Sequence, residues 1–244
     1  MGALVFHYAA PRTESDMTTT CRILALTVPL VLCGCGGGGS DASPAPAVSV
    51  PASVDAGAAW TVLLHTNKVY SVSGKASDGQ LYALSYTVTP GPTGSVASGK
   101  SDAVGLSTSL QRNGVLSSSS AETLYLYPGS GRVTGYSRPN ADCALISSGA
   151  EPSRSAALGQ SGALFSGHVL PGCFSTALGF EDISATWSIE SEGSTVYFCD
   201  NITDKGAVIA STTQLCVQVN AAGTLGAAVR VMVNNGTGLT VVMR

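Results

Sequence analysis

Apolar and small polar residues alternate along many short stretches of this chain, and this alternation limits the folds that it can adopt. Between positions 82 and 88, alanine, serine and threonine alternate with four larger residues, Tyr82, Leu84, Tyr86 and Val88. Successive side chains of a β-strand point to opposite faces, so this stretch has one apolar and one polar face. Turn-forming residues interrupt such stretches about every eight to twelve residues, which predicts an all-β domain built as an antiparallel β-sandwich or a barrel-like sheet.

Further stretches with the same alternation are Thr123 to Tyr127, Thr186 to Glu190, Leu215 to Val219 and Ala228 to Val233. Two Asn-Gly pairs, Asn113-Gly114 and Asn235-Gly236, indicate hairpins, because these residues accept the positive φ values of a type I′ turn. The second predicted hairpin places Val241 and Met243 in the core.

Residues 17–34 contain the three parts of an export signal. Arg22 supplies the positive start, Ile23 to Leu32 form a short apolar run, and Gly34 is the small residue expected at a cleavage site. A helix needs about twenty apolar residues to cross a bilayer, and this run has about ten, so we expect the segment to be removed. No other stretch shows a convincing helical period, and little or no helix is expected outside the signal.

The residues Leu32-Cys33-Gly34-Cys35 resemble the lipobox of bacterial lipoproteins, with leucine three positions and glycine one position before the final cysteine. The resemblance implies that Cys35 is acylated and attaches the protein to the lipid bilayer of a bacterial envelope, with Gly36 compatible with the outer membrane. The periplasmic and surface sides both remain open. The alternative is an ordinary secretory signal, which would leave Cys35 as an unpaired thiol.

Two further segments are expected to lie outside the folded domain. Residues 1–16 carry Glu14 and Asp16 where an export signal needs positive charge, so we expect translation to begin at Met17. Residues 35–58 are the lipidated cysteine and a Gly-rich, then Pro- and Ala-rich tether. The all-β domain is therefore predicted at 59–244, with either a long loop or a subdomain boundary near 137–162, where strand signals are weakest.

The chain has seven cysteines, of which the signal removes two and lipidation uses a third. The remaining four are Cys143, Cys173, Cys199 and Cys216. An even number in an exported protein predicts disulfides, and three pairings are possible. We favour Cys199 with Cys216 and Cys143 with Cys173, because each pair closes a short loop between neighbouring strands. The absence of a CxxC pair or a neighbouring histidine disfavours a metal site.

Charged residues form only 11% of the chain, and its net charge is -3. Without a basic run the chain is not expected to bind nucleic acid, whose phosphates require clustered lysine and arginine. The segment Gly94 to Ser101 matches the GxxxxGK[ST] phosphate-binding loop. That loop works only between a strand and a helix. Pro90 and Pro92 precede this segment and no helical period follows it, so we predict a turn-rich loop and no nucleotide.

Two groups of acids could carry chemistry, and each has a simpler structural explanation. Glu190 and Glu192 share one face of a predicted strand, where a carboxylate pair could hydrolyse a glycoside. Trp187 and Ile189 are expected to take the inward face, which leaves both acids in solvent. The segment Cys199 to Gly206 offers oxygen ligands for calcium, but its spacing is more typical of a turn.

Histidines and tyrosines supply the remaining candidates. His65 and His168 lie in strand-like runs, and the chain has no GxSxG motif to accompany a catalytic histidine, so both are interpreted as structural. Tyr125 and Tyr127 share a face that could bind a glycan or a protein. The simpler explanation is that a neighbouring sheet covers this face.

These features predict no catalytic residue, cofactor or metal. The favoured function is a non-catalytic structural or binding module, attached to a bilayer through Cys35 and contacting a protein or glycan partner. The alternative is an envelope hydrolase that acts on glycan or ester substrates through Glu190 or an unidentified serine. A lipid-carrying half-barrel is disfavoured, because no helix is expected to cover its mouth.

Overall fold

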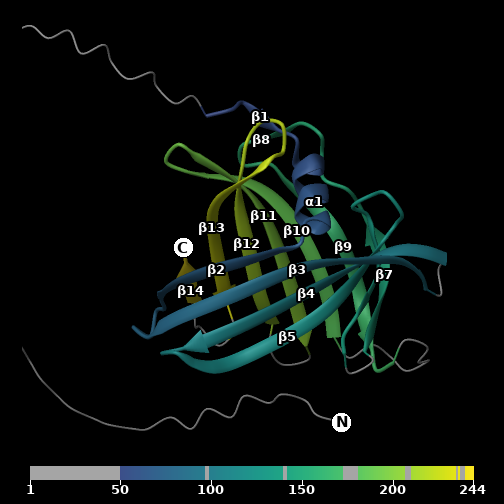
Figure 1. Ribbon diagram of the computed structural model, residues 1–244, viewed down its shortest axis with the longest axis horizontal. Helices are drawn as coiled ribbons and strands as arrows, with labels where there is room; N and C mark the ends of the chain where they lie inside the picture. The colour runs from purple at the N-terminus through teal and green to yellow at the C-terminus, as the bar shows by residue number, and fades with distance from the viewer. Residues whose placement is uncertain are drawn as a thin grey trace, which may run out of the picture. The chain divides into compact units, whose positions relative to one another are not determined.

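The computed structural model describes residues 50–96, 99–139, 142–172, 181–206, 210–234, 236 and 240–244 (Figure 1). The export signal, Cys35 and most of the predicted tether therefore lie outside the described residues. Within the described part the chain forms one helix, α1 (Ala56–His65), and fourteen strands. Two short strands, β1 (Ser53–Val54) and β8 (Ala156–Ala157), pair with each other and stand apart from the main sheet.

The other twelve strands form one antiparallel sheet in the order β14-β13-β12-β11-β10-β9-β7-β6-β5-β4-β3-β2, so that each strand pairs with its neighbours along the chain. These strands are β2 (Lys68–Lys75), β3 (Leu81–Val96), β4 (Gly99–Arg112), β5 (Val115–Leu126), β6 (Val133–Ser137), β7 (Cys143–Gly149), β9 (Ser161–Leu170), β10 (Glu181–Glu192), β11 (Thr195–Gly206), β12 (Ala210–Val219), β13 (Leu225–Asn234) and β14 (Thr240–Met243). The prediction of an all-β fold built from hairpins is confirmed, and the sheet has the barrel-like form.

The edge strands β2 and β14 meet and nearly close the sheet. The backbones of Ser73 and Arg244 exchange two hydrogen bonds of 3.3 and 3.2 Å, and the Ser77 N–H donates to the Thr240 carbonyl at 3.1 Å. Gly74 permits this approach, since a Cβ there would lie 2.3 Å from the Val242 carbonyl oxygen. Closure satisfies edge groups that would otherwise invite pairing with another chain.

Both predicted Asn-Gly hairpins connect strands that pair with each other. Asn113 and Gly114 join β4 to β5 with φ values of 51° and 80°, as a type I′ turn requires. The strands β13 and β14 also pair, as far as Asn234 with Thr240, while Asn235 of the predicted turn lies outside the described residues. Val241 and Met243 are 1% and 0% exposed, which confirms their predicted place in the core.

The stretch 137–162, predicted to be a long loop or a boundary, contains strand β7. This strand pairs with β6 on one side and with β9 on the other. The sheet therefore continues through the stretch. The sequence signal is weak because β7 has only seven residues and is rich in alanine, serine and glycine.

The helix α1 is the main departure from the predicted structure. Its buried residues lie at the spacing of one helical face and are Ala56, Ala59, Trp60, Leu63 and Leu64. Asp55 caps the helix, because its Oδ1 accepts a 2.8 Å hydrogen bond from the Ala58 N–H. The expectation that no segment has a helical period is therefore wrong. No helix of the described residues is long and apolar enough to span a bilayer.

The helix lies at one end of the barrel, near the upper ends of β9 to β11 in Figure 1. Loops from three connections hold it there. The Asp55 N–H donates to the Ala221 carbonyl at 3.0 Å and the Gly57 N–H donates to the Ser153 carbonyl at 3.1 Å. The third loop holds the side chain of Trp60, as described next. The helix therefore covers one mouth of the barrel. The sequence disfavours a lipid-carrying half-barrel only because no such helix is expected, so that reason does not hold.

Trp60 anchors α1 to the barrel. Its side chain is 1% exposed, its Nε1–H donates to the Gly131 carbonyl at 2.7 Å, and its ring lies 6.2 Å from that of Phe198. A Cβ at position 131 would lie 2.5 Å from Trp60 Cδ1, so the indole needs glycine there. Together with Leu63 and Leu64, Trp60 fills this end of the interior with apolar side chains.

We expect Trp60→Ala to lower the free energy of unfolding by about 3–5 kcal/mol, because the truncation leaves a cavity and an unpaired Gly131 carbonyl. Urea unfolding followed by circular dichroism measures this loss. Val62→Ala is the matched control, since Val62 lies on the opposite face of α1 and is 40% exposed. It should change stability by no more than about 0.5 kcal/mol. Equal losses in the two variants would contradict an anchoring role for Trp60.

Candidate functional site

The interior of the barrel becomes polar away from α1. Four carboxylates and one arginine gather there, from β5, β10, β11 and the residue after β6; we call them the interior acidic cluster, and they are Glu122, Arg138, Glu181, Asp200 and Asp204. Their positions follow from strand alternation. Glu122 lies in step with the core residues Leu124 and Leu126, and Asp200 with the core residue Phe198.

Arg138 organises the outer part of the cluster. Its Nη1 and Nη2 donate to the two carboxylate oxygens of Glu181 at 3.0 and 2.8 Å, which is the bidentate geometry of strong arginine pairs. Nη2 also donates to Asp204 at 3.3 Å, and Nε donates to the Tyr136 hydroxyl at 2.8 Å. The hydrogen bonds to Glu181 raise the pKa of Arg138. All three guanidinium nitrogens are therefore engaged.

Tyr136 connects Arg138 to Glu122. Its hydroxyl accepts the Arg138 hydrogen bond and interacts through a second hydrogen bond with the Glu122 carboxylate. Burial raises the pKa of Glu122, while this hydrogen bond and the charge of Arg138 oppose the rise. Burial also raises the pKa of Tyr136, and the Glu122 charge adds to the effect. Glu122 therefore has a hydroxyl partner but no ion pair of its own in the described part of the chain.

Asp200 is the deepest member of the cluster. Its residue is 3% exposed, and burial together with the charge of Glu122 raises the pKa of its carboxyl to about 7. Among the described residues, Asp200 Oδ1 and the hydroxyl of the 2% exposed Tyr70 have no hydrogen-bond partner. Tyr86 lies near both groups, and burial followed by the Asp200 charge raises the pKa of its hydroxyl well above the ordinary value.

Asp204 lies between the deep and outer parts. Burial raises the pKa of its carboxyl to about 7, the negative charge of Glu122 adds to this rise, and Arg138 opposes it. Its side chain is 28% exposed, compared with 20% for Arg138 and 15% for Glu181. One arginine thus faces four carboxylates, and the region holds either protons or an added positive charge.

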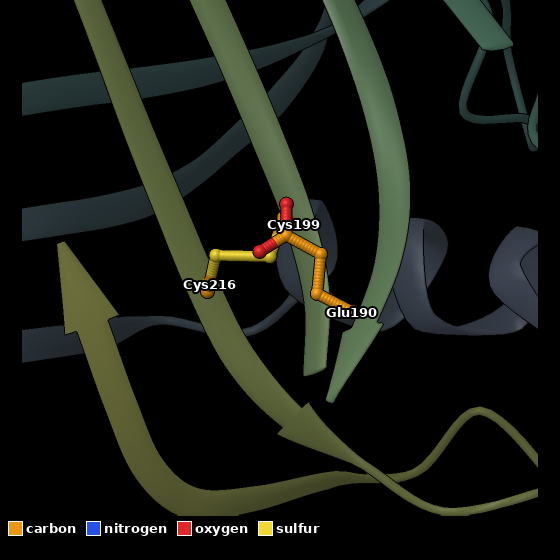
Figure 2. Close-up of side chains that lie close together, drawn as sticks. All are labelled: Glu190, Cys199 and Cys216. Atoms are coloured by element: carbon orange, nitrogen blue, oxygen red, sulfur yellow. A yellow bond between two sulfur atoms is a disulfide. The ribbon is translucent and has the colours of Figure 1, made fainter. Parts of the chain in front are cut away.

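A different acid lies on the outer wall, beside the disulfide between β11 and β12. Figure 2 shows the Glu190 carboxylate next to the bonded sulfurs of Cys199 and Cys216. The predicted pairing of these cysteines is confirmed, and bonded sulfurs are not free to ligate a metal. Glu190 accepts a 2.8 Å hydrogen bond from Gln214 Nε2 and forms an ion pair with Arg230. Both contacts join Glu190 to other strands of the outer wall, as expected of a structural residue.

The other residues of the two predicted acid groups lie on different faces of the barrel. Trp187 and Ile189 are buried, as predicted, and Glu192 lies on the outer face, where it pairs with Arg230 and Arg244. The segment Cys199 to Gly206 is part of strand β11, so its interpretation as a turn is wrong. Residues four apart on a strand share a face, which places Asp200 and Asp204 together inside the barrel.

The phosphate-loop match lies in an antiparallel hairpin. Ser95 pairs with Lys100 and Val96 with Gly99 across β3 and β4, so a strand stands where the loop would need a helix. The prediction of a turn-rich loop over the whole segment is wrong, because the residues at both ends of the segment belong to paired strands. Only residues 97–98 of this segment lie outside the described chain.

His65 is the last residue of α1 and is exposed, so its strand assignment is wrong. His168 lies in β9 and contacts Asp182 on the outer face. Tyr125 packs against Gly135, and Tyr127 is 54% exposed beneath Arg132. The opposite face of this strand, with Leu124 and Leu126, is core as predicted. The tyrosine face belongs to the outer wall of the barrel, so the predicted covering sheet is wrong. Cys143 is disulfide-bonded, while Cys173 and Cys35 lie outside the described residues.

Sequence reasoning did not identify Glu122, Tyr136, Arg138 or Glu181 as site residues. One feature of the sequence does indicate Glu122. It continues the alternation of Leu124 and Leu126, and an acid on the core-facing side of a strand needs a partner. Arg138 and Glu181 gave no such signal, because they are 43 positions apart and meet only through the pairing of the strands.

Comparisons of the chain with protein-family models, with curated proteins and with solved structures found no match.

We expect the Asp200→Asn variant to change how stability depends on pH. The carboxyl of an aspartate in the unfolded chain has a pKa of about 4, whereas that of Asp200 in the folded protein has a pKa of about 7. Between these values the folded chain binds a proton that the unfolded chain does not, so the stability from this group is present below about pH 4 and is lost as pH rises to 7. Urea unfolding at pH 5 and pH 8 should show wild-type stability falling relative to Asp200→Asn. Parallel pH curves for the two proteins would contradict the assignment.

Proposed function

We propose that this protein is a non-catalytic binding module, anchored to a bacterial envelope bilayer through an acylated Cys35, whose ligand enters the polar end of the barrel. The observation that carries the proposal is that two buried groups in the barrel, Asp200 Oδ1 and the Tyr70 hydroxyl, have no hydrogen-bond partner among the described residues. Burying a polar atom without a hydrogen bond costs about 1–3 kcal/mol. A ligand that contacts both atoms would remove this cost.

The exposure of the cluster indicates how a ligand reaches these groups. Asp200 is enclosed, while Asp204, Glu181 and Arg138 are partly exposed nearer the end of the barrel opposite α1. A route from solvent to Asp200 therefore passes the polar members of the cluster. The other end is filled by α1.

The proposed anchor and the barrel have separate roles. Two or three acyl chains on Cys35 give stable attachment, because each buried methylene contributes about 0.8 kcal/mol. The intervening tether would let the barrel present its polar end without a spanning helix. Support for the anchor comes from the lipobox resemblance, and support for binding comes from the interior of the barrel.

Cys35→Ser should move the protein from the membrane fraction to the soluble fraction, because the variant has no thiol to acylate. Growth with an alkyne analogue of palmitate, followed by fluorescent labelling, measures acylation directly. Cys33→Ser is the matched control and should remain labelled and membrane-bound. Labelling that persists in Cys35→Ser would overturn the proposed anchor.

The binding role predicts that the protein purified from its native membranes in mild detergent carries a small molecule. Native mass spectrometry should show a bound mass that unfolding releases, and Asp200→Asn should reduce its occupancy at least tenfold. Glu192→Gln, which alters an outer-wall acid, should leave the occupancy unchanged. A bound mass that Asp200→Asn retains in full would contradict binding at the interior acidic cluster.

A further inference from the structure

We infer that the ligand of the interior acidic cluster is a linear aliphatic amine with two or more ammonium groups, one held at Asp200 and Glu122 and another near Asp204. This inference rests on the proposed function and names its ligand class.

The charge of the cluster favours a cationic ligand. Arg138 directs its nitrogens to Glu181, Asp204 and Tyr136. No ion pair reaches Glu122 or Asp200 within the described residues. Two carboxylates in a low-dielectric interior repel each other, and an opposite charge at a few ångströms relieves both that repulsion and their desolvation. A neutral or anionic ligand would leave both costs in place.

The separation of the acids disfavours a bare metal ion. Calcium and magnesium bind six or more oxygens that converge within about 2.0–2.6 Å of the ion. Within the described residues, no three acids of the interior acidic cluster bring one oxygen each within 4.8 Å of one another. A metal ion would therefore meet too few protein oxygens here.

An ammonium group suits the deep position. It carries three donors that point in different directions, whereas a guanidinium offers a planar fork suited to a single carboxylate. The available acceptors are Asp200 Oδ1 and the Glu122 carboxylate, which belong to two different strands, β11 and β5. Donors that point in different directions allow one ammonium to contact acceptors on two strands.

The second charge follows from the spacing along β11. Asp200 and Asp204 are four residues apart on one strand, which places their Cα atoms about 13 Å apart at about 3.3 Å per residue. One ammonium cannot contact both acids. A flexible chain with charges at intervals can contact both while its methylenes lie against apolar wall residues such as Ile202 and Phe198.

Binding of this amine would displace protons. Asp200 and Asp204 are partly protonated near pH 7 because of burial and the charge of Glu122. The titratable or charged groups that interact with them are Tyr86, Glu122, Tyr136, Arg138 and Glu181. Tyr70 pairs with Tyr86, and the Lys68 ammonium lies 5.0 Å from the centre of the Tyr70 ring. An ammonium that replaces the proton keeps the local charge constant, so binding is expected to release protons and to strengthen as pH rises from 6 to 8.

The test is isothermal titration of the full-length, detergent-purified protein with spermidine at pH 7. Titrations in two buffers with different ionisation enthalpies give the number of protons released. Calcium chloride replaces spermidine in a second arm, and 1,8-octanediol, a neutral chain, replaces it in a third. Spermidine should bind with proton release, and the other two should bind at least tenfold more weakly.

Variants locate the site. Asp200→Asn and Glu122→Gln should each weaken spermidine binding at least tenfold, and Glu192→Gln, on the outer wall, should leave it unchanged. Near-ultraviolet circular dichroism verifies folding, and Glu122→Gln carries the test if Asp200→Asn does not fold. Unchanged spermidine binding in a folded interior variant, or tighter binding of calcium, would overturn the inference.

The outcome also separates the ligand class from the binding role. If spermidine fails to bind while the native protein carries a mass that Asp200→Asn loses, the ligand class is wrong and the binding role stands. If spermidine fails and no such mass is present, the binding role fails as well.

Discussion

The structure depends on the hydrogen bonds that join β2 to β14. These strands are the first and last of the main sheet, and their pairing brings distant parts of the chain together. Once the sheet closes, one face of every strand must be filled from within. At one end α1 supplies that filling with Trp60 and two leucines. At the other end the strands themselves turn acids, tyrosines and one arginine inward, so closure creates both the core and the candidate site.

At neutral pH, the polar end of the barrel lowers the free energy of unfolding. Isolated carboxylates in a protein interior are costly, and in practice they take up protons or find a partner. Arg138 compensates Glu181 and Asp204 directly and Glu122 through Tyr136, but its contacts end before Asp200. Pairing therefore decreases with depth in the cluster, from the paired acids near solvent to the unpaired acid inside. A purely structural network would be expected to satisfy its deepest member first, because desolvation is greatest there.

Period-two alternation was sufficient to predict the class of fold, because each strand carries that signal locally. Asn113-Gly114 fixed one hairpin for the same reason. The helix was missed because its first turn, Ala56 to Ala58, has the small-residue composition of the preceding tether. The acidic cluster was missed because a single strand does not show which residues face each other across a barrel. Asp200 and Asp204 were noticed as possible ligands, but local composition suggested a turn, whereas pairing with β10 and β12 makes them part of a strand.

The disulfide on the outer wall and the acid inside the barrel occupy adjacent residues of β11. Cys199 points outward and is bonded to Cys216 on β12, while Asp200 points inward opposite Leu215. A covalent link of this kind stabilises a domain by about 2–4 kcal/mol, chiefly by limiting the unfolded chain. That contribution is comparable to the cost of an unpaired buried polar group. The cross-link on one face of β11 thus offsets the cost of Asp200 on the other, and it lets the strand keep a carboxylate that only protonation or a bound cation satisfies.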